Sequence, residues 1–264
     1  MIAGIMGRMA TPSLEGAFGF LLALSLTVVA CRAERVQPRP ELLPAPPLMP
    51  APPSAPAPPK SGSLIDLGAP VVSGGMALER VLAARRSVRQ FAGAALSTAD
   101  LGQLAWAAQG VTDQAEGLRT APSAGALYPL ELYFVTRDGV DRYVPERHAF
   151  ERLDLGDVRE PLANAALSQG AILSAPCDVV ITAVTRRTAE KYGDRAHRYV
   201  ALEAGHAAQN LLLEATARGL VGVPIGAFED RAVSEVLGLA GGEDPLYIVA
   251  LGHARRPAPV SGAR

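Results

Sequence analysis

Five residues from Arg85 to Arg89 carry three guanidiniums and the hydroxyl of Ser87. Such a group can bind a phosphate through paired hydrogen bonds and still offer a cation to a second acceptor. The residues from Leu78 onward have helical apolar spacing, which predicts a helix over 78–90 with the basic residues at its end. On composition alone, a solvated helix end that complements the helix dipole is the simpler interpretation.

Two loop-like segments could approach a flat ligand. Arg119 to Pro129 reads RTAPSAGALYP, in which proline, alanine and glycine form a stiff turn without bulk and Ser123 can reach a ligand edge. Gly219 to Phe228 reads GLVGVPIGAF, and a strand that ends at Gly226 lets the backbone approach a planar ring and offer an N–H. Each segment also fits an ordinary connection between two elements.

Three other reactive side chains are expected to serve in packing. His206 lies among alanines on an expected long helix, and because no nucleophile accompanies it we expect a buried, hydrogen-bonded histidine. Cys177 precedes an apolar run and is expected to be a small core residue, and Trp106 is expected to pack from an amphipathic helix.

Composition excludes several classes of function. The two cysteines and four histidines have no ligand spacing, so we expect no metal held by the protein. A formal net charge of −1 offers no positive field for nucleic acid. No dinucleotide fingerprint appears, so a nicotinamide donor, if one is used, would bind only transiently.

The elements that must position these segments mix hairpins with helices. Asp138-Gly139 is a strong two-residue hairpin signal, and Ser97 to Asp100 resembles a capping box at a helix start. The order predicts an α+β fold with a central, mostly antiparallel sheet flanked by helices. Strands are expected at 130–136, 140–144, 178–184, 221–225 and 246–251, and helices at 78–90, 97–108, 158–168, 195–218 and 231–237.

The first seventy residues differ from the rest. Residues 1–30 contain a short apolar run that fits a signal peptide, and its ending before Cys31 resembles a lipobox, which predicts a lipidated cysteine. Residues 31–70 are rich in Pro and Ala and are expected to form an extended tether before a domain at 71–257 and a tail at 258–264. The expected location is the bacterial cell envelope, lipid-anchored or periplasmic. A misassigned start codon would instead leave a cytoplasmic protein.

The sequences of these segments and their order along the chain resemble those of the nitroreductase superfamily and, within it, the SagB-type (ThcOx-like) azoline dehydrogenase branch. The resemblance runs from Leu78 to His253 and rests on the strings RRSVRQF, RTAPSAGALYPLELYFV, KYGDRAHRY, EAGHAAQN and GLVGVPIGAF. It implies a nitroreductase-like fold that binds FMN and works as a homodimer with the flavin ring at the subunit interface.

The resemblance also implies a set of binding residues. Arg85 and Ser87 would bind the FMN phosphate with Arg255 or Arg256, and Arg89 would face the pyrimidine side of the ring and favour its anionic reduced form. The full set that the resemblance assigns to the cofactor is Arg85, Ser87, Arg89, Pro122, Ser123, Ala124, Gly125, Ile225, Gly226, Ala227, Arg255 and Arg256.

The two loops would contact the ring from different subunits. Pro122 to Gly125 would line the flavin of the partner subunit, and Gly226 and Ala227 would sit beside N5. Many nitroreductases have an acidic residue in place of Gly226 and an asparagine in place of Ala126, so this pocket is expected to be less polar than theirs.

Lys191-Tyr192 matches the Lys-Tyr pair on which azoline dehydrogenases depend. When a hydride leaves a ring carbon, a proton must leave the neighbouring atom, and either side chain could accept it. A pair on a helix surface is an equally good interpretation.

Three functions follow from these observations. The first is oxidation of azoline rings in a peptide, which the leader fits poorly because enzymes that modify peptides normally work in the cytoplasm. The second is reduction of nitroaromatics or quinones by NAD(P)H. The third is an envelope-anchored flavin-binding module without turnover.

Overall fold

The computed structural model describes residues 61–255. The expected signal peptide, Cys31, most of the expected tether and Arg256 lie outside the described residues. Between residues 61 and 255, no helix has the length and apolar character needed to cross a membrane.

An eight-stranded sheet forms the centre of the domain, and its strand pairs are antiparallel. The strand order is β1-β7-β6-β5-β8-β10-β2, and β9 pairs with β10. A separate hairpin is formed by β3 (Val111–Asp113) and β4 (Leu118–Arg119). The strands of the sheet are β1 (Ser61–Asp66), β2 (Phe91–Ala92), β5 (Leu130–Thr136), β6 (Gly139–Val144), β7 (Ala149–Leu153), β8 (Cys177–Ala183), β9 (Val221–Ile225) and β10 (Asp244–Ala254).

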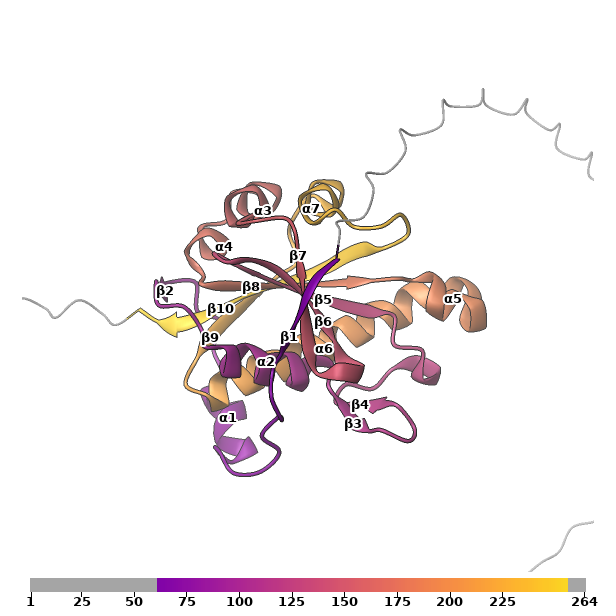
Figure 1. The fold of residues 1–264 in the computed structure, drawn as a ribbon, viewed down its shortest axis with the longest axis horizontal. Helices are drawn as coiled ribbons and strands as arrows, with labels where there is room; N and C mark the ends of the chain where they lie inside the picture. The colour runs from indigo at the N-terminus through magenta and orange to yellow at the C-terminus, as the bar shows by residue number, and fades with distance from the viewer. Residues whose placement is uncertain (1–60, 256–264) are drawn as a thin grey trace, which may run out of the picture. The chain divides into compact units, whose positions relative to one another are not determined.

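Helices cover both faces of this sheet (Figure 1). Alternate residues of a strand face opposite ways, so β5 sends Phe134 into a core shared with α2 and α6 and Tyr133 into a core shared with α3 and α7. The expected α+β class with a central antiparallel sheet is confirmed. The helices are α1 (Leu78–Ala84), α2 (Thr98–Gln109), α3 (Arg159–Ala165), α4 (Gly170–Ser174), α5 (Arg186–Tyr192), α6 (Ala196–Ala217) and α7 (Asp230–Leu237).

Several predicted elements appear at the predicted residues. Strands β5 and β9 have the expected bounds, and Val135 pairs with Val140 across the Asp138-Gly139 turn. Ser97 caps α2 in a capping box with Asp100. Cys177 is buried, as expected of a core residue.

Two predicted helices are wrong in their extent. The helix predicted over 78–90 ends at Ala84, because the Val88 N–H donates to the Gly222 carbonyl of β9 at 3.0 Å and pulls the chain out of helical geometry. The helix predicted over 158–168 is shorter, since α3 ends at Ala165 and Leu167 and Ser168 both take left-handed backbone conformations. Helix α4 begins at Gly170, beyond the predicted end.

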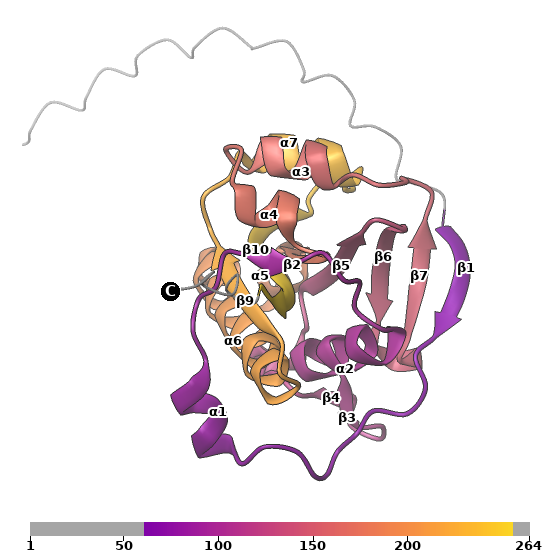
Figure 2. The same ribbon diagram turned by 90° about the vertical axis from the view of Figure 1, so that its left-hand side faces the viewer.

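Strand β1 lies in the segment that was expected to be the end of the tether. It pairs with β7 at the outer edge of the sheet (Figure 2). The structure therefore departs from the expected tether at Ser61–Asp66, whose backbone completes the ladder of β7.

Asp178, the second residue of β8, is a fully buried carboxyl group. Neither of its oxygens has a hydrogen-bond partner within residues 61–255. Burial raises the pKa of Asp178 well above its ordinary 3.8, and the charge of Arg159 lowers it only in part. At pH values between 3.8 and this raised pKa, Asp178 therefore keeps its proton in the folded domain and releases it in the unfolded chain.

This proton makes stability depend on pH. The stabilising contribution of neutral Asp178 is complete below about pH 4 and is lost as the pH rises through the raised pKa of the folded state. We expect Asp178→Asn to match the parent near pH 4 and to exceed its free energy of unfolding by roughly 1–3 kcal/mol at pH 8. Urea denaturation at several pH values measures this, with the exposed Asp154→Asn as control. If the difference in free energy of unfolding between Asp178→Asn and the parent does not change with pH, the raised pKa assigned to Asp178 is wrong.

Candidate active site

The basic segment, Arg85–Arg89, lies in extended form beside β9. Ser87 forms a parallel bridge with Gly222, so side chains alternate along the segment and Arg85, Ser87 and Arg89 share one side. Arg86 is not part of this group, because its guanidinium folds back onto the carbonyls of Ala83 and Arg85. The shift from helix to extended chain therefore puts on one side the three residues of this segment that are expected to bind FMN.

The C-terminal end of β10 lies beside the basic segment. His253 pairs with Ala92 of β2, and the Arg255 N–H donates to the Gln90 carbonyl at 3.5 Å. Within the described chain, no carboxylate lies within ion-pair distance of Arg85, Arg89 or Arg255. Their positive charges can therefore serve a bound anion.

Gly226 and Ala227 directly follow Ile225 at the end of β9. Both are exposed, so their backbone is open to a ligand. The Gln169 side chain donates to the Ala227 carbonyl at 2.8 Å and ties this turn to the start of α4. Sequence reasoning missed Gln169. The two left-handed residues before it, which direct it to Ala227, leave no clear pattern in the sequence.

The PSAG loop, Arg119–Pro129, holds a strained backbone. Gly125, Ala126 and Tyr128 have φ values of +65°, +54° and +44°. Left-handed conformations are costly for residues other than glycine and persist only where surrounding contacts impose them. One such contact lies inside the loop, where the Ser123 hydroxyl accepts a hydrogen bond from the Tyr128 N–H at 2.9 Å.

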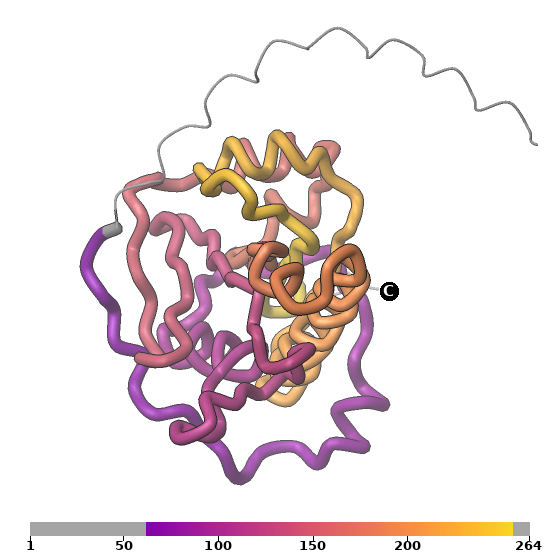
Figure 3. Tube along the Cα trace, turned by 90° about the vertical axis from the view of Figure 1, so that its right-hand side faces the viewer, coloured from indigo at the N-terminus to yellow at the C-terminus, as the bar shows by residue number. Residues whose placement is uncertain are grey.

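Lys191 and Tyr192, at the end of α5, contact the PSAG loop. A methyl group placed on Gly125 would lie 2.9 Å from the Tyr192 hydroxyl oxygen and 3.0 Å from the Lys191 ammonium nitrogen. The Tyr192 ring packs edge-on against Tyr199 of α6 at 5.1 Å between centroids. The trace in Figure 3 shows α5 leading into α6. The structure thus brings two predicted groups together, the Lys-Tyr pair and the PSAG loop.

The basic segment and the PSAG loop lie at opposite ends of the sheet. Gly222 aligns through Leu251 with Cys177 at the start of β8, whereas Leu130, next to the PSAG loop, pairs with Ala183 at its end. Six steps of about 3.3 Å separate these ends of β8 by roughly 20 Å. One chain therefore presents two separate groups of predicted site residues.

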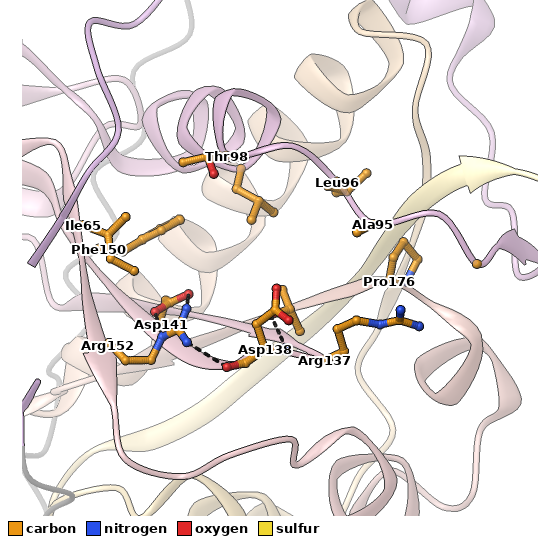
Figure 4. A pocket seen from close by; sticks show the side chains of 13 residues that line it. Ile65, Ala95, Leu96, Thr98, Arg137, Asp138, Asp141, Phe150, Arg152 and Pro176 are labelled. Carbon is orange, nitrogen blue, oxygen red and sulfur yellow. Dashed lines mark hydrogen bonds and ion pairs between the residues drawn. The ribbon is translucent and has the colours of Figure 1, made fainter. Parts of the chain in front are cut away.

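A cavity of about 120 Å³ is lined by residues that include Asp141, Arg152 and Pro176 (Figure 4). Asp141 is buried there, and Arg152 donates to its carboxylate at 2.5 Å and to the Asp138 carbonyl at 2.7 Å. Arg152 neutralises Asp141 here, and the lining of this cavity contains none of the predicted site residues.

His206 does not fit the prediction made for it. The prediction of a buried histidine is wrong, since His206 is exposed on α6 and Glu203, one turn earlier, is buried in its place. Glu203 accepts a hydrogen bond from the Ala124 N–H at 2.8 Å. A lone carboxylate on a helix face of alanines and leucines was the signal that could have found it.

A central antiparallel sheet with helices on both faces, and with these loops around β9 and α6, is the nitroreductase-like fold. The chain belongs to the nitroreductase family, whose sequence pattern matches residues 82–253. Members of this family are generally FMN-dependent oxidoreductases, and this chain is an oxidoreductase of the same family.

Known proteins agree with this assignment. A candidate nitroreductase of Methanocaldococcus jannaschii is 45% identical over 181 residues, which cover 66% of this chain and 90% of that protein. The crystal structure of a candidate nitroreductase from Ralstonia eutropha JMP134 superposes with a TM-score of 0.67 at 28% identity, covering 79% of this chain and 100% of that one. The NADPH:FMN oxidoreductase of Vibrio harveyi, solved with NAD⁺, shares the fold with a TM-score of 0.52 at 24% identity, covering 70% and 74%.

Proposed function

We propose that this chain is a SagB-type, FMN-dependent dehydrogenase that oxidises azoline rings in a peptide. The observation that carries the proposal is the contact of Lys191 and Tyr192 with Gly125. This contact places two proton acceptors beside a loop that is expected to line the flavin.

The residues present fit FMN. Arg85, Ser87 and Arg255 offer cations and a hydroxyl to a phosphate, and no described carboxylate neutralises those cations. Gly226 and Ala227 offer exposed backbone to the ring. At Gly125 the left-handed backbone, with φ at +65°, suits glycine and leaves the loop surface without a side chain, which fits close approach.

The chemistry divides between cofactor and chain. Bound FMN would supply the hydride acceptor for the ring carbon of the azoline. Lys191 Nζ as the neutral amine, or Tyr192 Oη as the phenolate, would take the proton that leaves the neighbouring ring atom, so the azoline would lose two electrons and two hydrogens and become an aromatic azole. The PSAG loop fixes where these two side chains lie.

A homodimer is part of the proposal. Because the basic segment and the PSAG loop lie at opposite ends of β8, a flavin that touches both requires a second chain. Leu78 and Leu82 on α1 and Leu202 on α6 are all more than half exposed and are available to such an interface.

A nitro or quinone reductase that uses NAD(P)H is the second candidate. It is favoured by the 45% identity to the M. jannaschii protein and by the exposed turn at Gly226 and Ala227, which leaves the expected ring face open to a transient donor. A flavin-binding module without turnover is the remaining alternative. Lipidation of Cys31 and an envelope location belong to the proposal as well, and labelling with a radioactive fatty acid tests them.

Single-turnover kinetics with the full chain distinguish the candidates. We expect the FMN-loaded protein to convert one azoline per flavin without air or added oxidant, and the flavin absorbance near 450 nm to bleach at the same rate, because the bound flavin is the acceptor. Bleaching by NADPH but not by an azoline peptide would favour the reductase. Bleaching by neither would favour the module without turnover.

A further inference from the structure

We propose that Glu203 is a positioning residue that holds the PSAG loop in the conformation used for FMN and for the Lys-Tyr pair. The inference rests on the proposed function, because it assigns the loop to the flavin. Its starting observation is the 2.8 Å hydrogen bond from the Ala124 N–H to Glu203 Oε1. This bond joins α6 to a loop 79 residues earlier in the chain.

Glu203 is placed where a carboxylate is disfavoured. It is 4% exposed on a helix face that otherwise buries Ala204, Ala207 and Leu211. A buried carboxylate is retained only when hydrogen bonds compensate for its lost hydration, and a backbone N–H that meets an ionised acceptor makes one of the stronger bonds available. The Ala124 N–H therefore explains why an acidic residue occupies this face.

The hydrogen bond to Glu203 lies next to the part of the PSAG loop with left-handed backbone conformations. Ala124 immediately precedes Gly125, and the left-handed residues that follow need contacts from outside to keep their conformation. Asn210, two turns further along α6, makes a weaker contact of the same kind, donating to the Thr120 carbonyl at 3.3 Å. Helix α6 thus holds both the start and the middle of the loop.

The Lys-Tyr pair depends on the same bond. Lys191 and Tyr192 contact Gly125, so a movement of Ala124 moves the surface against which their reactive atoms rest. No hydrogen bond or ion pair joins Glu203 to either side chain in the described structure, so it acts through the loop backbone. We therefore expect its replacement to weaken FMN binding and to slow proton transfer together.

Three variants of the full chain distinguish the effect of the Glu203 hydrogen bond from the effect of the Glu203 charge. Glu203→Gln keeps an oxygen at the Oε1 position but removes the charge, Glu203→Asp withdraws the acceptor by one methylene, and Glu203→Leu removes it. The matched control is Glu214→Leu, a half-buried glutamate on the same helix outside both site groups.

Amide hydrogen exchange of the flavin-free chain and FMN binding followed by fluorescence quenching are the two measurements. For Glu203→Leu and Glu203→Asp we expect exchange of the Ala124 amide and the dissociation constant for FMN each to increase about tenfold or more. Glu203→Gln should stay within about threefold of the parent on both, and Glu214→Leu should leave both unchanged. If Glu203→Leu does not fold, the comparison of Glu203→Asp with Glu203→Gln still tests the role of the hydrogen bond.

Two results would overturn the inference. The hydrogen bond has no positioning role if Glu203→Asp and Glu203→Leu keep parental exchange at Ala124 and parental FMN affinity. The charge, and not the bond, is what counts if Glu203→Gln loses as much as Glu203→Leu. Failure of the proposed function is a separate outcome, because a parent chain that binds no FMN or oxidises no azoline still reports the Ala124 contact through amide exchange.

Discussion

Replacing Lys191 with alanine is expected to slow azoline oxidation at least a hundredfold while leaving FMN bound. The reason is that general base catalysis contributes about 10²–10⁴-fold, and the Lys191 ammonium nitrogen lies at the loop expected to line the flavin. The measurement is the single-turnover rate of flavin bleaching by an azoline peptide. Flavin content is measured on the same sample.

The matched control for this variant is Glu190→Ala. Glu190 precedes Lys191 on α5, and its side chain is 69% exposed in an ion pair with Arg186. Its loss should change the rate less than twofold, because exposed ion pairs of this kind contribute little. If Lys191→Ala oxidises the peptide at the parental rate, the pair has no catalytic role and the azoline proposal loses its main support.

Gly125→Ala is expected to have the second large effect, a loss of at least tenfold in the same rate. The new methyl group would lie 2.9 Å from Tyr192 Oη and 3.0 Å from Lys191 Nζ, so both reactive atoms must move, and catalysis is sensitive to small displacements of positioned groups. The left-handed backbone, with φ at +65°, adds about 1–2 kcal/mol of strain for alanine.

Gly117→Ala separates strain from overlap. Gly117 has nearly the same backbone conformation, with φ at +64°, but nothing lies within 4 Å of a methyl group built there. Both variants should therefore lose similar stability in a thermal melt, and only Gly125→Ala should lose activity. Equal activity in the two variants would show that the contact with the Lys-Tyr pair has no consequence for turnover.

Local signals in the sequence were enough for part of the fold. Strand β5 alternates between its two cores, and Asp138-Gly139 fixes the hairpin after it. The capping box of Ser97 and Asp100 needs only four consecutive residues. These elements could be predicted because the interactions that define them lie within a few residues of each other.

Elements defined by distant partners could not be predicted in this way. The end of α1 depends on a hydrogen bond between Val88 and Gly222, which are far apart in the sequence. Strand β7 was missed because its charged residues hide its pattern, and they are neutralised across the strand pair, Glu151 by Arg142 and Arg152 by Asp141. Neither pairing is visible before the strands are aligned.

In the candidate site, too, local motifs could be predicted and contacts between distant residues could not. The motifs identified the basic segment, the PSAG loop and the Lys-Tyr pair, but only the fold shows that the last two touch and that the first lies elsewhere on the sheet. The sequence did not show that Glu203, and not His206, is the buried residue, because this depends on where the PSAG loop packs on α6.

Binding of FMN to the purified full chain is the decisive measurement. After reconstitution with FMN and removal of free flavin, we expect a yellow protein that retains about one FMN per chain and loses it when Arg85 and Ser87 are both replaced by alanine. A folded chain that retains no FMN, or that retains as much without Arg85 and Ser87, would show that the basic segment is not a flavin site.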